Sequence, residues 1–276
     1  MLPHQHGIGA RLARVGKAAA PMLSRLLARR YSSALDYGAQ YLALLEGKGG
    51  GAGWDLRSEV TAALRFIPRG DALVVDVGAN AGAWSDEVLQ ARPEVRIIQF
   101  EPNHECQPPP HPRATLLPLA LSDREGAAIL YRTAASPDTS SLHVRRDSIV
   151  AHHNYEATEV EVTTLDSIYS RHEAFGLQAI AFMKMDIEGH ELAALRGAAG
   201  LLESGQIMSL SFEFGSSNLN SRTFFKDLWD MLVPLGYAIW RVLPGGHILP
   251  VEYYHETLEH FRGVSNYIAS RRAPVE

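Results

Sequence analysis

The sequence predicts an α/β fold with a mostly parallel sheet that binds a nucleoside. Three observations carry this prediction: an apolar run that ends in a glycine turn, a helix-compatible segment, and a second apolar run that ends in an acid. They occupy residues 73–77, 83–91 and 95–100, and the acid is Glu101. Strand, glycine turn, helix and strand in this order form half of a nucleotide-binding fold.

The residues of the turn have distinct tasks in this interpretation. Gly78 and Gly82 let the backbone turn sharply and let a ligand approach the amides closely. Glu101 lies nineteen residues after Gly82, where a carboxylate is placed to accept both hydroxyls of a ribose. The alternative is an ordinary turn with a solvated acid at the strand end.

The glycine positions argue against a dinucleotide. Its fingerprint requires glycine at positions 80 and 83, and this chain has Asn80 and Ala83 there. The segment D-V-G-A-N-A-G instead resembles motif I of class I S-adenosylmethionine-dependent methyltransferases. The resemblance implies that Asp76, Asn80 and the amides around Gly78 face the methionine part of the cofactor.

Composition narrows the class of protein. The chain has 276 residues, of which 46% are hydrophobic, and this is ample for one α/β domain with extensions. A net charge of −5 gives no indication of a nucleic-acid surface, because such domains are basic. The one cysteine, Cys106, has no partner for an internal disulfide, so we expect a cytoplasmic protein.

The N-terminal region differs from the rest of the chain. The first 35 residues hold six basic side chains and no acidic one, and a glycine-rich stretch follows at 46–53. We expect residues 1–53 to form a basic helical extension with a linker, and 54–276 to form the catalytic domain. The extension is predicted to cap that domain or to contact a second copy of the chain. A targeting peptide or a membrane-surface helix is the alternative, and no apolar run is long enough to span a membrane.

A third strand is predicted at residues 115–121, followed by Ser122 and Asp123. These two side chains then lie at the carboxyl edge of the sheet, where ligands bind in open α/β folds. In the methyltransferase interpretation they contact the adenine amine. The alternative is that they cap their own turn.

A long polar insertion lies between two further predicted strands, at 127–132 and 159–164. Insertions of this kind usually form a lid or a substrate loop, or are disordered. Ser140 and Ser141 within it are candidate substrate contacts.

Acidic and imidazole groups follow a second buried strand, at residues 180–185. Asp186, Glu188, His190 and Glu191 lie within six positions of one another, at the ligand edge of the predicted sheet. Four titratable groups at this edge favour a catalytic site. The alternative gives Asp186 and Glu191 only helix-capping roles.

A fifth strand is predicted at residues 206–214, with Glu213 near its ligand edge and Asn218 soon after it. Both are candidate substrate contacts, because carboxylate and amide groups hydrogen-bond polyols. Residues 247–251 and 266–269 predict a final antiparallel pair of strands.

Five segments together resemble the FkbM family of S-adenosylmethionine-dependent methyltransferases: V-V-D-V-G-A-N-A-G, I-I-Q-F-E-P-N, A-L-S-D-R-E-G, V-T-T-L-D and M-K-M-D-I-E-G-H-E followed by L-R-G. The resemblance covers roughly residues 73–214. It implies a class I methyltransferase fold, Rossmann-like, with a mostly parallel seven-stranded sheet and an antiparallel C-terminal strand. It also implies methylation of a hydroxyl on a sugar, a glycoconjugate or a secondary metabolite such as a polyketide. The residues predicted to bind the cofactor are Asp76, Gly78, Asn80, Gly82, Glu101, Ser122, Asp123 and Asp186.

The chemistry of methyl transfer suggests roles for the acids. A hydroxyl is a weak nucleophile, so a base or a cation near it speeds its attack on the sulfonium methyl group. His190 has a suitable ordinary pKa, and Asp186 or Glu188 is expected to act directly or to orient it. A divalent metal such as Mg²⁺ on Asp186 and Glu213 is the alternative.

Two other functions remain open at this stage. An NAD-dependent oxidoreductase fits the nucleotide-binding half, although the missing glycines argue against it. A non-catalytic assembly partner that keeps the fold is the second. For the enzyme, we expect a small-molecule or glycan acceptor and no nucleic acid.

Overall fold

The computed structural model describes residues 20, 32–50, 56–133, 136–145 and 155–275. The chain divides into two compact units, residues 1–43 and 44–276. Most of the predicted basic extension lies outside the described residues, so the extension and the domain boundary at residue 53 stay predictions. Within the predicted linker, the Gly49 N–H donates a hydrogen bond to Ser265 Oγ at 3.0 Å. Among the described helices, none is both long and apolar enough to cross a membrane.

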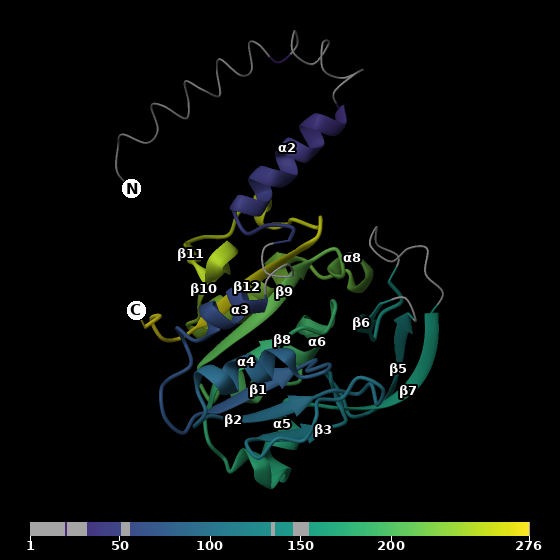
Figure 1. Cartoon of the computed structure of the whole chain (residues 1–276), viewed down its shortest axis with the longest axis vertical. Helices are drawn as coiled ribbons and strands as arrows, with labels where there is room; N and C mark the ends of the chain where they lie inside the picture. The colour runs from purple at the N-terminus through teal and green to yellow at the C-terminus, as the bar shows by residue number, and fades with distance from the viewer. Residues whose placement is uncertain (1–19, 21–31, 51–55, 134–135, 146–154, 276) are drawn as a thin grey trace. The chain divides into compact units, whose positions relative to one another are not determined.

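The larger unit is built on a mixed sheet with the strand order β11-β10-β12-β9-β8-β1-β2-β3 (Figure 1). Neighbouring strands from β3 to β9 run parallel, and β12 is antiparallel to both β9 and β10. The strands are β1 (Leu73–Val77), β2 (Arg96–Phe100), β3 (Ala114–Leu117), β8 (Ile180–Met185), β9 (Ser209–Gly215), β10 (Ala238–Val242), β11 (Ile248–Val251) and β12 (Val264–Ser270). This confirms the predicted fold class, although the sheet has eight strands in the described chain, because β11 adds an edge to the expected seven.

The pairing of the last strands differs from the prediction. Residues 247–251 and 266–269 do form strands, but β11 pairs with β10, and β12 lies between β10 and β9. The sequence pattern predicts that a strand exists, whereas its partner depends on which buried faces meet. The prediction that these two strands form a terminal hairpin was therefore wrong.

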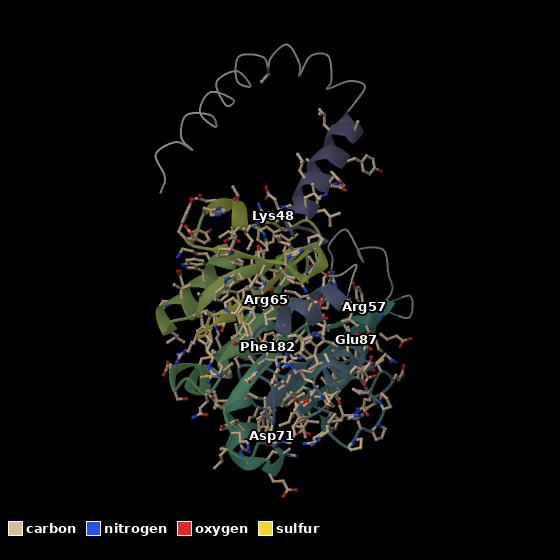
Figure 2. All side chains as sticks on the ribbon, turned by 60° about the vertical axis from the view of Figure 1, so that its left-hand side comes forward. Lys48, Arg57, Arg65, Asp71, Glu87 and Phe182 are labelled. Atoms are coloured by element: carbon tan, nitrogen blue, oxygen red, sulfur yellow. The ribbon has the colours of Figure 1, made fainter. Side chains whose placement is uncertain are left out.

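Helices cover both faces of the main sheet. One apolar cluster joins α3 and α4 to one face through Val74, Phe182 and Ile268, and Figure 2 shows Phe182 within the larger unit. A second cluster joins α5, α6, α7 and α9 to the opposite face. The α-helices of the larger unit are α3 (Leu56–Ala63), α4 (Ala83–Ala91), α5 (Leu165–Arg171), α6 (Glu191–Arg196), α7 (Ala199–Glu203), α8 (Asn218–Ser221) and α9 (Phe225–Leu232), while α2 (Ser32–Leu45) spans the boundary between the units. Short 3-10 helices are η1 (Glu173–Phe175), η2 (Val233–Leu235), η3 (Pro244–Gly246) and η4 (Glu256–Leu258).

A second, smaller sheet has the strand order β4-β7-β5-β6 and stands beside the main sheet in Figure 1. Its strands are β4 (Ala120–Leu121), β5 (Gly126–Thr133), β6 (Ser136–Ser141) and β7 (Tyr155–Thr163). The predicted single strand at 115–121 is therefore two strands in two sheets, and Pro118, which lacks an N–H group, lies between them. Part of the predicted irregular insertion is also a strand, β6, which pairs with β5.

Candidate active site

Two loops meet at the carboxyl edge of the main sheet. Gly78 follows β1 with φ of 77°, and a Cβ atom at this position would lie 2.0 Å from the carbonyl oxygen of Asp186, which follows β8. Only glycine allows so close an approach. Gly82 has φ of 87°, and a Cβ there would lie 2.9 Å from Cβ of Pro108. The two glycines therefore serve the packing of the loop against its neighbours.

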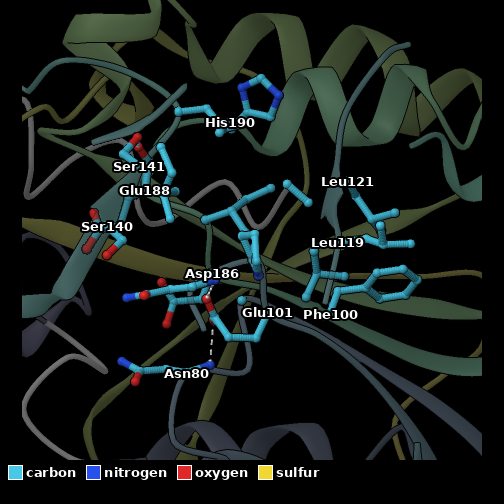
Figure 3. A pocket seen from close by; sticks show the side chains of 18 of the residues that line it. Asn80, Phe100, Glu101, Leu119, Leu121, Ser140, Ser141, Asp186, Glu188 and His190 are labelled. Atoms are coloured by element: carbon cyan, nitrogen blue, oxygen red, sulfur yellow. Dashed lines mark hydrogen bonds between the residues drawn. The ribbon is translucent and has the colours of Figure 1, made fainter. Parts of the chain in front are cut away.

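Glu101 is held in place by backbone amides. Its carboxylate accepts hydrogen bonds from the N–H of Asn80 and the N–H of Asn103, both at 2.8 Å (Figure 3). Burial raises the pKa of the Glu101 carboxyl, and the two N–H groups partly offset this effect. The side chain is thus oriented before any ligand arrives, with acceptor capacity left for hydroxyl groups.

A cavity opens above Glu101, and we name it the central cavity. It contains about 660 Å³ of empty space, part of it open to solvent. Apolar Phe100, Leu119 and Leu121 form one side, whereas Ser140, Ser141 and Glu188 lie opposite (Figure 3). Its other predicted residues are Gly78, Asn80, Glu101, Asp186 and His190. An apolar slot beside a fixed carboxylate suits a flat base attached to a ribose.

A second cavity, which we name the acidic cavity, adjoins the central one. Gly78, Asn80 and Asp186 line both, and Glu59, Lys184 and Glu213 line the acidic cavity with them. It holds about 830 Å³ of empty space, including open solvent. Asp186, whose side chain is 38% exposed, therefore lies where the two cavities join.

Lys184 organises the floor of this region. Its Nζ lies 3.4 Å from a carboxylate oxygen of Asp76 and 3.4 Å from one of Asp186, and it donates to the Gly78 carbonyl at 3.1 Å. Burial opposes the charge on Lys184, but Asp76 and Asp186 outweigh that effect and raise its pKa. The ammonium is therefore permanently charged and ties the two loops together.

Asp76 is fully buried, and its predicted contact with the cofactor stays a prediction. Its carboxylate is 0% exposed, accepts a hydrogen bond from Ser85 Oγ at 2.7 Å and pairs with Lys184. It lines neither the central nor the acidic cavity. The effect of Asp76 on a ligand is transmitted through Lys184.

The predicted metal alternative finds no support. In the described part of the chain, no group of three or more His, Cys, Asp or Glu side chains is arranged to hold a metal ion. Next to Asp186, the place of a cation is taken by the ammonium of Lys184.

His190 has hydrogen-bond partners for both ring nitrogens. Nε2 lies 3.0 Å from Ser122 Oγ, and Nδ1 lies 3.1 Å from Nε2 of His143. Burial, together with the neighbouring His143, lowers the pKa of His190 to about 4. A neutral imidazole that is already hydrogen-bonded on both sides is a weak base at neutral pH, and this geometry favours a positioning role.

Ser122 and Asp123 lie on the far side of His190 from the central cavity. With His143, Arg124 and His190 they line a third cavity, which does not include Glu101. Ser122 and Asp123, two predicted adenine contacts, therefore lie outside the cavity that contains Glu101, and the two cavities share Leu142 and His190.

Glu188 is paired with a buried arginine. Arg145 Nη1 lies 2.6 Å from the Glu188 carboxylate, and the two side chains are 2% and 13% exposed. Ser141 Oγ also donates to the Glu188 carbonyl at 2.9 Å. These contacts hold the smaller sheet against the loop after β8, and they leave Glu188 less suited to act as a base than Asp186.

Asn218 has a structural role in the turn after β9. It is 0% exposed, and its Oδ1 accepts a hydrogen bond from the Gly215 N–H at 2.8 Å. Sequence reasoning overlooked three residues of the site, Glu59, Arg145 and Lys184. A lone lysine within the apolar run 180–185 was the signal for Lys184, whereas no pattern pointed to the other two.

The fold is that of a class I methyltransferase, an α/β protein with cavities at the carboxyl edge of its parallel strands. The chain belongs to the FkbM methyltransferase family, since the model of the methyltransferase FkbM domain matches residues 76–239.

Several solved structures are similar to this chain. Methyltransferase FkbM from Methylobacillus flagellatus KT is 15% identical, with a TM-score of 0.43, and the match covers 74% of this chain. The match spans only 45% of that chain. Magnesium protoporphyrin IX methyltransferase from Synechocystis PCC 6803, solved with bound S-adenosylmethionine, is 14% identical with a TM-score of 0.36, and the match covers 79% of this chain and 78% of that one. No curated protein matches the sequence.

Proposed function

We propose that this protein transfers the methyl group of S-adenosylmethionine to a hydroxyl of a small molecule or glycan. The observation that carries the proposal is the Glu101 carboxylate, which two amides hold at the base of an apolar cavity. When the ribose of S-adenosylmethionine is bound there through its hydroxyls, the adenine lies against Leu119 and Leu121. The sulfur of the cofactor then lies toward Gly78 and Asp186. Family membership supports methyl transfer as the reaction.

Asp186 is the residue we assign to the acceptor. It lines both cavities and is the most accessible member of the Lys184 cluster. In the proposed reaction the acceptor oxygen forms a bond to the methyl carbon, the carbon–sulfur bond breaks with its electrons on sulfur, and the hydroxyl proton passes to Asp186. Holding the oxygen in line with the methyl group supplies much of the acceleration.

The remaining predicted residues take supporting roles in this proposal. Ser140 and Ser141 flank the bound adenosine, His190 holds Ser122, and Glu213 contacts the acceptor in the acidic cavity. The acceptor class, a sugar, glycoconjugate or secondary metabolite, follows from the family resemblance. We propose the cytoplasm as the compartment, because one cysteine is compatible with a reducing environment.

Ligand-induced stabilisation tests the cofactor. A ligand that binds only the folded state raises the melting temperature, so S-adenosylhomocysteine should raise it and NAD should not. A rise with NAD and none with S-adenosylhomocysteine would reject the proposal in favour of an oxidoreductase.

A further inference from the structure

The acidic cavity has more negative groups than its one cation balances. Glu59 on α3, Asp186 after β8 and Glu213 on β9 all line it, and Lys184 is the basic residue among its lining residues. Lys184 is shared between Asp76 and Asp186, 3.4 Å from each. For Glu59 and Glu213, no ion pair is found within the described ranges of the chain.

The two unpaired carboxyls are sensitive to charge in the cavity. Burial and the charge on Asp186 raise the pKa of Glu59 to about 7, against a smaller opposing effect of Lys184. The same two influences raise the pKa of Glu213. A cation that enters the cavity would stabilise the ionised form of both.

Asn266 lies behind the two carboxyls of this cavity and is not one of its lining residues. It is 6% exposed, and its Oδ1 has no hydrogen-bond partner among the residues that the structure describes. It lies directly opposite Glu213 in the register of β12 and β9, so both side chains point to the same face of the sheet, and it hydrogen-bonds Glu59. The side-chain amide of Asn266 therefore donates to Glu59, and the carboxyls of Glu59, Asp186 and Glu213, which do line the cavity, suit a cationic ligand.

Position relates this cavity to the cofactor. Gly78, Asn80 and Asp186 form the border between it and the central cavity. The sulfur of S-adenosylmethionine is one carbon away from the ribose, so a ribose held by Glu101 brings the sulfur to this border. Before the reaction the sulfur is a cationic sulfonium, and afterwards it is a neutral thioether.

We propose that Glu59 and Glu213, with Asn266, make this protein prefer the sulfonium of S-adenosylmethionine over the thioether of its product. The inference rests on the proposed function. Glu59 and Asn266 lie outside residues 76–239, so the family match does not include them. The sulfonium stabilises the ionised form of both carboxyls, and this attraction is lost when the methyl group leaves, which favours release of the product.

Calorimetric titration of the full chain tests the inference. Dissociation constants for S-adenosylmethionine and S-adenosylhomocysteine are measured for the wild type, Glu59→Gln and Glu213→Gln. Each substitution should weaken binding of the cationic cofactor more than binding of the product. The ratio of the two dissociation constants should therefore fall by about three- to tenfold. Asp86→Asn, an exposed carboxylate on the neighbouring helix α4, is the matched control and should leave the preference unchanged.

A wild-type measurement keeps the test decisive if a variant fails to fold. Sinefungin carries an ammonium group in place of the methylated sulfonium, so it should also bind more tightly than S-adenosylhomocysteine. Equal affinity of the wild type for all three ligands, or equal loss of affinity for cofactor and product in the variants, would overturn the inference and leave the proposed function intact. Failure of all three to bind would overturn the proposed function as well.

Discussion

Single residues decide which ligand this site can hold. Glu101 has a fixed carboxylate with acceptor capacity to spare, whereas His190 and Asp76 have their polar atoms engaged by protein groups. The difference comes from neighbours and not from residue type. An exposed histidine is a good base near neutral pH, but one that is buried and beside a second imidazole is not.

Replacing Glu101 should mainly weaken cofactor binding. In Glu101→Ala the ribose hydroxyls lose a charged acceptor, and hydrogen bonds of this type are worth about 1.5–3 kcal/mol, or roughly a ten- to hundredfold change in affinity. Calorimetric titration with S-adenosylhomocysteine measures the change. Glu105→Ala, an exposed neighbour, is the control. An unchanged dissociation constant in Glu101→Ala would contradict ribose binding at this carboxylate.

Glu191 should make a contribution to stability that falls as the pH rises from about 5 to 8. Glu191 is 0% exposed, and burial raises its pKa from 4.5 to about 7, despite hydrogen bonds from its own loop. Glu191 therefore binds more protons in the folded state than in the unfolded state across that window, and its contribution to the free energy of unfolding decreases with pH, whereas the lowered pKa of His190 acts in the opposite direction below about pH 6.5. Glu59 and Glu213 act in the same direction.

Thermal melts between pH 5 and 8 test this assignment. Glu191→Gln removes one titrating group and keeps an acceptor for the Gly189 and Ile187 amides, so its melting temperature should vary less with pH than that of the wild type. Glu203→Gln, on the exposed side of α7, should follow the wild-type curve. If the melting temperatures of Glu191→Gln and the wild type depend on pH in the same way, Glu191 is not the group that binds the extra proton in the folded state.

At the scale of secondary-structure elements, the site depends on the contacts between the smaller sheet and the loop after β8. Strand β6 ends at Ser141, and the segment after it carries Arg145, so the contacts of both with Glu188 join this sheet to the loop after β8. Glu188 has φ of 53°, an uncommon conformation for a side-chain-bearing residue. These contacts hold the wall of the central cavity in place.

Breaking the Arg145 pair should destabilise the protein strongly. Arg145→Met removes the guanidinium from a mostly buried Glu188 carboxylate, and breaking a buried pair costs about 3–5 kcal/mol. The double variant Arg145→Met with Glu188→Gln should lose less than the sum of the single variants, as measured by urea denaturation. Arg124→Met breaks an exposed pair with Asp123, which is 3.4 Å long, and should cost less than about 1 kcal/mol. Additive losses at Arg145 and Glu188 would refute the coupling.

At the scale of the whole molecule, both ends of the larger unit meet beside the acidic cavity. Glu59 precedes β1, and Asn266 belongs to β12, the last strand, yet Asn266 hydrogen-bonds Glu59 and lies opposite Glu213. The antiparallel insertion of β12 beside β9 makes this possible. All residues that line the central and acidic cavities lie between positions 56 and 213.

Removal of residues 1–43 should therefore leave cofactor binding unchanged. We expect the chain 44–276 to melt at a temperature close to that of the full chain and to bind S-adenosylhomocysteine with an affinity within about twofold. Size-exclusion chromatography of both chains measures whether the basic extension joins two copies, as the sequence predicts. Loss of binding in the shorter chain would show that the extension completes the catalytic domain.

Local chemistry made much of this protein predictable from its sequence. Gly78 and Gly82 were identified because a sharp turn requires glycine, and the buried strands because β-branched apolar runs favour them. Glu101 and Asp186 followed from their positions at strand ends. Each of these inferences needs only a residue and its neighbours in the chain.

Other features depend on contacts between residues far apart in the sequence. The charge partners of Lys184, the pairing of Arg145 with Glu188 and the meeting of Glu59 with Asn266 all require the assembled sheet. Burial also lowers the pKa of His190, and the residues that bury this side chain include His143, which is distant in the sequence. The sequence by itself determined the class of protein and the position of its ligand edge. Only the tertiary structure decided which side chains at that edge are free to act, because hydrogen bonding, burial and charge depend on distances in space.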